Sequence, residues 1–392
     1  MNKLDILNRE TVAFARKIYG DGFIALHRPV FEGNERKYLV DCIDSNFVSS
    51  VGEKVNLFEE EIAKFTGSKY AIATVNGTAA LHIAIMLADV KPGDEVITQA
   101  LTFIATCNAI SYTGAKPLFI DVDFDTMGLS PDALKLFLEN NAEKRADGTY
   151  NKLSGKKISA CVPMHTFGFP CRIKNIAAIC SEWGINLIED AAESLGSYVN
   201  GSHTGTFSKL ATLSFNGNKV ITTGGGGMII TDDINIAKKA KHLTTTAKVN
   251  HPYEFFHDEV GYNYRMPNLN AALGCAQLER LQECLHEKAK VSNEWSEFFK
   301  VRDIIFVQAL DGSKANHWLN SIILSSKEER DTFLKYTNEN NVMTRPIWTL
   351  MSKLPMFQDC HTDGLKNSLW LEERVVNIPS SVPDGALKDF KG

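Results

Sequence analysis

The sequence predicts an α/β fold with a mostly parallel central sheet that is covered by helices. From about residue 70, short apolar segments alternate with segments of helical period, as is typical of parallel strands joined by helical crossovers. The strand segments are almost continuously apolar, which indicates that both faces of the sheet are buried. The chain has 392 residues, enough for two domains of the usual size of about 100–200 residues.

The expected elements follow one another with short turns. We expect strands at 69–74, 94–99, 117–121, 158–164, 185–190, 211–216 and 227–233, and helices at 77–88, 103–114, 130–140 and 173–184. Ser130 followed by Pro131 indicates an N-cap and a first helical residue, and Gly114 suits a C-cap. Segment 139–156 is polar and contains glycine, so we expect an exposed insertion there.

The character of the chain changes after Asp233. An amphipathic segment and a polar, aromatic stretch lead into residues 269–299, which have the pattern of one long helix. We therefore expect three parts: an N-terminal arm (1–35) that packs on the small domain, a large domain (36–245), and a smaller C-terminal α/β domain (246–392).

Composition excludes several classes of protein. The formal net charge is −5, without the basic excess typical of nucleic-acid binding. No apolar run approaches the roughly 18–20 residues that span a bilayer, and the N-terminal segment mixes both charge signs, unlike a secretory signal. The eight cysteines form no CxxC pair and several lie in apolar segments, which favours free thiols in a reducing compartment. We expect a cytoplasmic protein that binds neither nucleic acid nor membrane.

A possible phosphate site follows the first strand. Asn76-Gly77-Thr78-Ala79 lies between a strand and a helix, and a glycine turn into a helix N-terminus offers free N–H groups and a positive dipole end to a phosphate. The alternative is a simple strand-to-helix turn that Thr78 caps.

Acidic residues follow the strand at 185–190. Glu189 and Asp190 end the strand and Glu193 comes three residues later. A buried carboxylate needs a partner, and the protonated ring nitrogen of a cofactor would serve. The alternative is an N-cap for the next turn.

A lysine and a glycine run follow the strand at 211–216. A lysine near apolar or cationic groups can form a Schiff base, so Lys219, five residues after Ser214, is a candidate nucleophile; the alternative is a surface lysine. The run Gly224–Gly227 has no following GK[ST] and leads into a strand, so it is neither a Walker A loop nor a dinucleotide fingerprint.

The order of these features is more informative than each one alone. A phosphate turn, then an acid, then a lysine, each at a strand end, is the order that pyridoxal 5′-phosphate (PLP) requires in the large aminotransferase fold. There the phosphate anchors the cofactor, the acid keeps the ring nitrogen protonated, and the lysine forms the covalent link and moves the proton.

Longer motifs run through most of the chain, from about residue 27 to 350: FVSSVGEKVNLFEEEIAKFTG, NGTAALHIAI, TFIATCNAI, HTFGFP, EDAAESLG, SFNGNKVITTGGGGMI, GYNYRMPNLNAALGCAQL and TRPIW. In these motifs the chain resembles the DegT/DnrJ/EryC1/StrS sugar-nucleotide aminotransferases. SFNGNKVITTGGGGM, with GNE and TRPIW, resembles the branch that acts on UDP-linked 4-keto-6-deoxy-N-acetylhexosamines in legionaminic acid and bacillosamine synthesis. The resemblance implies PLP-dependent transferase fold type I, which is aspartate aminotransferase-like.

The resemblance also implies roles for single residues. Lys219 would be the Schiff-base lysine, and Asp190 would pair with the ring nitrogen. Further cofactor contacts would come from the turn, from a stacking aromatic and from the lysine motif: Gly77, Thr78, Ala79, Phe103 and Ser214. Glu193 stands where the family usually carries Gln or His near the cofactor.

Asn263 and Arg265, in GYNYR, match residues that the family supplies from the neighbouring subunit. Asn263 would reach the phosphate and Arg265 the substrate, so a homodimer with shared sites is expected. Arg345 and Trp348 are candidate contacts to the nucleotide sugar, and the alternative for both is simple packing. His165 is a further candidate, and it would be either structural or next to the substrate.

The implied reaction is a transamination that moves an amino group from L-glutamate to the C4 ketone of a nucleotide sugar for surface glycan synthesis. A dehydratase of the same fold would carry His in place of Lys219, and a regulator without activity would not need these residues. A nicotinamide oxidoreductase would need the missing glycine fingerprint. No metal is expected, since His251, His257 and Glu259 fit no standard zinc spacing.

Overall fold

A computed structural model describes residues 3–387. Its centre is a nine-stranded sheet with the strand order β1-β11-β10-β7-β6-β2-β3, and β4 and β5 extend it as a hairpin beside β6. The strands are β1 (Tyr70–Thr74), β2 (Glu95–Gln99), β3 (Lys116–Ile120), β4 (Ala142–Arg145), β5 (Gly148–Asn151), β6 (Lys157–Val162), β7 (Asn186–Asp190), β10 (Leu210–Ser214) and β11 (Gly227–Thr231). The predicted α/β fold with a mostly parallel sheet is confirmed.

Most strands of this sheet run in one direction, whereas β11 and the hairpin strand β5 run the other way. Strands β10, β7, β6, β2 and β3 pair in parallel, whereas β11 is antiparallel to both β1 and β10. Since β11 lies between β1 and β10, β1 and β10 point the same way. The carboxyl ends of β1, β10, β7 and β2 therefore meet at one edge of the sheet, where open α/β sheets bind ligands.

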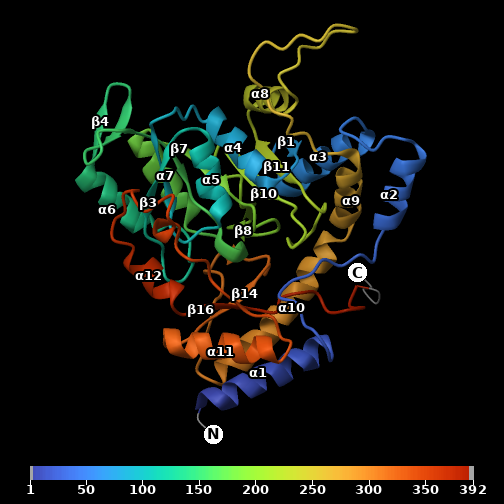
Figure 1. Cartoon of the computed structure of the whole chain (residues 1–392), viewed down its shortest axis with the longest axis vertical. Helices are drawn as coiled ribbons and strands as arrows, with labels where there is room; N and C mark the ends of the chain where they lie inside the picture. Colours follow the sequence, from blue (N-terminus) through green and yellow to red (C-terminus); the bar gives the residue numbers. More distant parts are fainter. Residues whose placement is uncertain (1–2, 388–392) are drawn as a thin grey trace.

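Helices pack against this sheet (Figure 1). They are α3 (Glu53–Thr66), α4 (Gly77–Leu87), α5 (Ile104–Tyr112), α6 (Pro131–Asn141), α7 (Ile173–Trp183) and α8 (Ile234–Thr244). Helix α2 (Glu35–Asp44) packs on α9 (Asn268–Glu279) instead. The predicted start of α6 is confirmed, because Pro131 is its first residue and Ser130 Oγ accepts a hydrogen bond from Ala133 N. Gly114 follows α5 with a positive φ of 78°, the conformation in which glycine ends helices at low cost.

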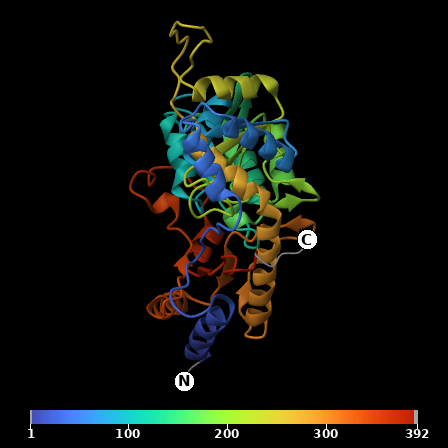
Figure 2. The same cartoon turned by 90° about the vertical axis from the view of Figure 1, so that its right-hand side faces the viewer.

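A smaller antiparallel sheet lies on the other side of the molecule (Figures 1 and 2). Its strands are β12 (Ile305–Phe306), β14 (Asn320–Ile323), β15 (Arg345–Pro346) and β16 (Val375–Ile378), in the order β12-β14-β16-β15. Helices α1 (Lys3–Tyr19), α10 (Leu281–Lys300), α11 (Lys327–Glu339) and α12 (Lys366–Glu372) belong to this part. A third sheet joins β13 (Ser313–Lys314) to β8 (Tyr198–Val199) and β9 (Ser202–His203), and short η helices cover Thr166–Gly168 and Met351–Lys353.

The N-terminal helix is part of the smaller core. Leu7, Val12 and Ala15 of α1 are buried in one cluster with Trp295 and Phe299 of α10. We keep 1–35, 36–245 and 246–392 as proposed domains, whose outermost residues 1–2 and 388–392 lie outside the described part. One element departs from this division, because α9 (Asn268–Glu279) packs mainly on α2 and α3.

Two sequence predictions need correction. The expected single helix at 269–299 is two helices, α9 and α10, that meet at Arg280 (φ −104°, ψ 2°). There the guanidinium donates to Glu32 O and Leu387 O, and the break lets α10 leave the large sheet for the smaller one. The expected exposed insertion at 139–156 contains the β4–β5 hairpin, in which Thr149 and Asn151 are buried.

The remaining general predictions concern thiols and membrane spans. All eight cysteines are free thiols, as predicted, and seven of them are buried. Among residues 3–387, no helix combines the length and the apolar character needed to cross a bilayer.

Candidate active site

A cavity of 620 Å³ opens at the carboxyl edge of the large sheet. Its walls come from both parts of the molecule, because the strand ends of the large sheet face β15 and the segment after it. The lining residues include nine of the residues singled out from the sequence, namely Gly77, Thr78, Phe103, Asp190, Glu193, Ser214, Lys219, Arg345 and Trp348. Residues that come from five separate segments of the chain thus converge on one site.

The turn after β1 presents backbone amides to this cavity. Asn76, not Thr78, is the N-cap of α4, and its Oδ1 accepts from Ala79 N at 2.8 Å. The ladder of α4 begins with Ala80 N donating to Asn76 O, so the N–H groups of Gly77 and Thr78 precede it and are available to an anion. A Cβ on Gly77 would lie 3.0 Å from Ser214 Cβ, which explains why glycine suits this position.

Neighbouring acids at the end of β7 have separate environments. Asp190 lines the cavity; its Oδ2 accepts from Thr106 Oγ1 at 2.7 Å and its Oδ1 from Ala192 N at 3.2 Å. Burial raises the pKa of Asp190, against the effect of the Thr106 hydrogen bond. A cation at the cavity side of Asp190 would relieve this cost. Glu189 lies away from the cavity, where Gly205 N and Phe207 N each donate to it at 2.7 Å.

Lys219 lies between a carboxylate and an aromatic face. Its Nζ is 3.1 Å from Glu193 Oε1 and 3.9 Å from the centre of the Trp318 ring. The lysine side chain is 13% exposed and the glutamate 1%. Burial raises the pKa of Glu193 to about 6, although the charge of Lys219 opposes this shift. The arrangement holds the amine at the cavity surface.

Aromatic side chains form the wall opposite the strand ends. The ring centres of Phe167 and Trp348 are 4.7 Å apart, and those of Phe103 and Trp348 are 6.1 Å apart. Phe103 is 47% exposed, so one face of its ring is open to a planar ligand. Arg345 completes this wall, and its Nη1 donates to Asn338 Oδ1 at 2.9 Å.

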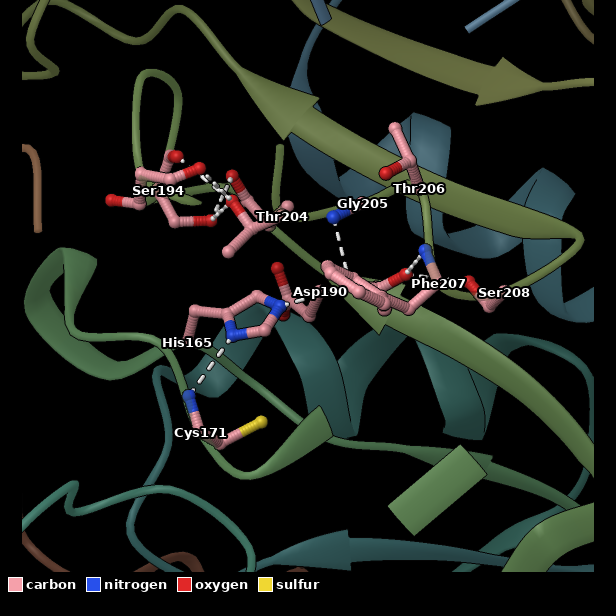
Figure 3. Close-up of polar contacts among 12 residues, drawn as sticks. His165, Cys171, Asp190, Ser194, Thr204, Gly205, Thr206, Phe207 and Ser208 are labelled. Atoms are coloured by element: carbon pink, nitrogen blue, oxygen red, sulfur yellow. Dashed lines mark hydrogen bonds and ion pairs between the residues drawn. The ribbon is translucent and has the colours of Figure 1, made fainter. Parts of the chain in front are cut away.

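Four of the singled-out residues lie outside the cavity lining. The Ala79 amide already donates to Asn76, so it is not free for a phosphate. His165 is fully buried: its Nε2 lies 3.1 Å from Glu189 Oε2, and its Nδ1 accepts from Cys171 N (Figure 3). These contacts favour the structural alternative for His165 over a contact with the substrate. Asn263 is exposed, and its Oδ1 accepts from Arg265 Nε and Nη2 at 3.2 and 3.1 Å.

The cavity also contains residues that the sequence did not single out. Trp318 covers Lys219 and its Nε1 donates to Asn218 O at 2.6 Å, but it lies in a loop without a motif. Phe167 lies within the quoted HTFGFP segment, and its φ of 56° is uncommon for a residue with a side chain. Asn216 and Asn218 also line the cavity; they flank Gly217 in the lysine motif, which was the available signal.

A group of possible metal ligands lies elsewhere, near the end of α8. The ligand atoms of His242, Asp258 and Glu259 lie within 4.8 Å of one another. His251 and His257, which the sequence suggested beside Glu259, are not members of this group. Lys239 already pairs with Glu259, and His242 Nε2 lies 2.7 Å from Asp258 Oδ1, so each carboxylate of the group already has a polar partner on the chain.

Comparison with protein families decides what this site is. The model of the DegT/DnrJ/EryC1/StrS aminotransferase family matches residues 29–384. The chain belongs to this family. It is therefore a transaminase whose cofactor is PLP, and the nicotinamide oxidoreductase alternative is wrong.

Individual relatives agree with the family assignment. The chain is 35% identical over 362 residues to a GDP-perosamine synthase of Vibrio cholerae, covering 91% of this chain and 94% of that protein. It is 36% identical to the enzyme of the same name from Caulobacter vibrioides, covering 91% and 93%. Among solved structures, Helicobacter pylori PseC, an aminotransferase involved in pseudoaminic acid biosynthesis, has a TM-score of 0.82 at 20% identity, covering 91% and 94%. This structural likeness shows the fold, and fold type I is confirmed.

The residues present fit PLP. The amides of Gly77 and Thr78 and the hydroxyl of Ser214 suit a phosphate, whereas buried Asp190 suits a protonated ring nitrogen. The exposed face of Phe103 suits a flat ring, and Lys219 offers an amine. All of these groups face the same cavity.

Proposed function

We propose that this transaminase moves an amino group from L-glutamate to the C4 ketone of a nucleotide-linked 4-keto-6-deoxy sugar. The proposed sugar substrate is UDP-2-acetamido-2,6-dideoxy-hexos-4-ulose, and the product would serve surface glycan biosynthesis of the legionaminic acid or bacillosamine type. One observation carries the proposal: the PLP-type residues and the TRPIW segment with Arg345 and Trp348 line opposite walls of one cavity.

The cofactor, when bound, supplies an aldehyde that links to amines and a protonated ring that withdraws electrons. Lys219 Nζ would hold the cofactor between turnovers and move a proton to and from the reacting carbon. Asp190 would keep the ring nitrogen protonated, and the amides of Gly77 and Thr78 with Ser214 would bind the phosphate. Phe103 would pack on one face of the ring.

We further propose that the functional unit is a homodimer. Asn263 and Arg265 lie outside the cavity of their own chain, bonded to each other. They match motif positions that the family supplies to the neighbouring subunit, so they would complete the phosphate and substrate sites of the partner.

The identity of the nucleotide is the finer part of the proposal. The UDP assignment rests on the sequence blocks SFNGNKVITTGGGGM, GNE and TRPIW, of which the first and last reach the cavity. In GNE, Glu35 is buried and accepts from Gln277 Nε2 at 2.7 Å. This block therefore contributes to packing and does not line the cavity. The named relatives are GDP-perosamine synthases, which makes a GDP-linked sugar the competing substrate.

The test is a substrate panel. The PLP-loaded protein is incubated with L-glutamate and UDP-, TDP- and GDP-linked 4-keto-6-deoxy sugars, with and without a 2-acetamido group. Product mass and NMR then identify the sugar that gains an amine and its stereochemistry. We expect the UDP-2-acetamido sugar to be converted fastest; faster conversion of the GDP sugar would overturn the UDP assignment.

Lys219→Ala is expected to abolish turnover and the borohydride-reducible link, and retained transamination would refute the role of Lys219.

A further inference from the structure

Glu193 contacts both the amine of Lys219 and the turn that carries Phe167. Its Oε1 lies 3.1 Å from Lys219 Nζ, and its Oε2 accepts from Phe167 N at 2.9 Å. The carboxylate thus touches the reacting amine with one oxygen and holds a strained backbone turn with the other. A Gln could still accept from Phe167 N through its single amide oxygen, but its NH2 group could neither accept from the Lys219 ammonium nor take up a proton.

The geometry around Lys219 leaves a single carboxylate in direct contact with its amine among the described residues. Trp318 covers another side of the amine with its ring at 3.9 Å and offers no site for a proton. The titratable groups that face Glu193 are Lys219 and Asp190, and its remaining contact is the neutral amide of Phe167.

Resting on the proposed function, we propose that Glu193 is a positioning residue that exchanges a proton with Lys219. In this step the ammonium of Lys219 gives one proton from Nζ to Oε1 of Glu193, which leaves a neutral amine and a neutral carboxylic acid. The neutral amine is the form that reacts with an aldehyde. When Lys219 is released again, the proton returns from Oε1 to Nζ.

The electrostatics of the site permit this exchange at neutral pH. Burial raises the pKa of Glu193 to about 6, and the charge of Lys219 limits the shift. Above this pH the side chain is mainly a carboxylate that can accept a proton, and below it the acceptor is already filled. The exchange therefore predicts a pH step near 6 in any process that needs the neutral amine.

The Phe167 turn adds a second requirement on the side chain at position 193. Phe167 has a φ of 56°, which a residue with a side chain rarely adopts, and its ring centre lies 4.7 Å from that of Trp348. Loss of the acceptor on Glu193 would release this turn and move the aromatic wall. Two substitutions separate the two contacts: Glu193→Gln keeps an acceptor for Phe167 N, whereas Glu193→Ala removes both contacts.

The experiment measures cofactor uptake, which needs no sugar substrate. Cofactor-free protein is mixed with PLP between pH 5 and 8, and covalent attachment to Lys219 is trapped with borohydride and followed by mass. We expect the wild-type rate to rise through about pH 6 and then level off. Glu193→Gln is expected to react about tenfold more slowly at pH 7 and to lack the step. Glu143→Gln, at a half-buried position of the hairpin strand β4 away from the cavity, is the matched control and should behave as wild type.

The outcomes are distinguishable. A wild-type rate and pH step in Glu193→Gln would overturn the exchange while leaving the proposed function intact. If the wild type attaches no PLP at Lys219, the proposed function and the exchange are both wrong. A changed near-ultraviolet circular dichroism spectrum in Glu193→Ala, but not in Glu193→Gln, is expected from release of the Phe167 turn. The same change in Glu193→Gln would mean that its slow uptake comes from the turn, which would also overturn the exchange.

Discussion

Two lysines contact the same tryptophan in different surroundings. Lys219 lies against the ring of Trp318 and beside the Glu193 carboxylate. Lys288 donates to the carbonyl oxygens of Trp318 and Ser380. Lys219 borders a cavity of 620 Å³, whereas Lys288 is 1% exposed. One lysine is thus open to a reactant and the other is enclosed.

The enclosed lysine belongs to a group of bases whose pKa values burial lowers. Burial lowers the pKa of Lys288 to about 7 and that of His317 to about 4, and it holds the pKa of His27 well below its usual value. A buried cation without a carboxylate loses its proton because the charge is poorly solvated. The comparison teaches that burial alone does not make a lysine a nucleophile; access and a proton partner are also needed.

The sharpest test of this contrast is covalent labelling of both lysines. Protein loaded with PLP is reduced with borohydride, digested and mapped by mass. We expect the label at Lys219 and none at Lys288, because Lys288 has no path to the cofactor and its amine already bonds two carbonyls. A label on Lys288 would show that the enclosed surroundings of this lysine open in solution.

The next largest effect is expected at Asp190, the acid that lines the same cavity as Lys219. Asp190→Asn keeps the shape but removes the charge that would hold the ring nitrogen protonated. We expect kcat to fall by roughly 10²–10³-fold, the usual scale for losing one preorganised electrostatic contact. Steady-state kinetics on PLP-saturated protein would measure this loss, and an unchanged kcat would contradict the assigned role.

A stability measurement addresses the enclosed region. Between pH 7 and 10.5, Lys288 is protonated only in the unfolded chain, so the wild type gains stability as pH rises. Relative to Lys288→Met, we expect this gain to be about 1.4 kcal/mol per pH unit, measured by urea unfolding at pH 7.5 and 9. Lys300→Met, at an exposed site of α10, should show no such slope. A flat difference for Lys288→Met would mean that the amine is charged in the folded protein.

The smallest effect is expected for the tryptophan that both regions share. Trp318→Phe retains an aromatic face toward Lys219 but loses the hydrogen bond from Nε1 to Asn218 O. We expect the free energy of unfolding to fall by about 1 kcal/mol, with the labelling of Lys219 retained. Loss of the label in this variant would show that the hydrogen bond, not the ring, positions the lysine loop.

Local sequence patterns predicted much of the cavity around Lys219 and nothing of the enclosed surroundings of Lys288. Asp190, Lys219 and the Gly77 turn follow apolar strands, and parallel topology brings such strand ends to one edge. Glu193 was expected near the cofactor, but its contact with Lys219, like that of Trp318, depends on tertiary packing, for which the sequence offers no periodic signal. The fold was predictable to the same degree: alternating segments gave the large sheet, but the break at Arg280 depends on contacts with residues far along the chain.

The antiparallel strand β11 has a consequence for the way the protein is made. Tyr70 at the start of β1 pairs with Thr231 of β11, and β11 is the strand that connects β1 to the rest of its sheet. A ribosome that adds roughly 5–20 residues per second needs on the order of ten seconds or more to reach β11 after β1. During this time β1 and its phosphate turn have no native partner strand, and such delayed long-range pairing slows folding and exposes the strand to aggregation.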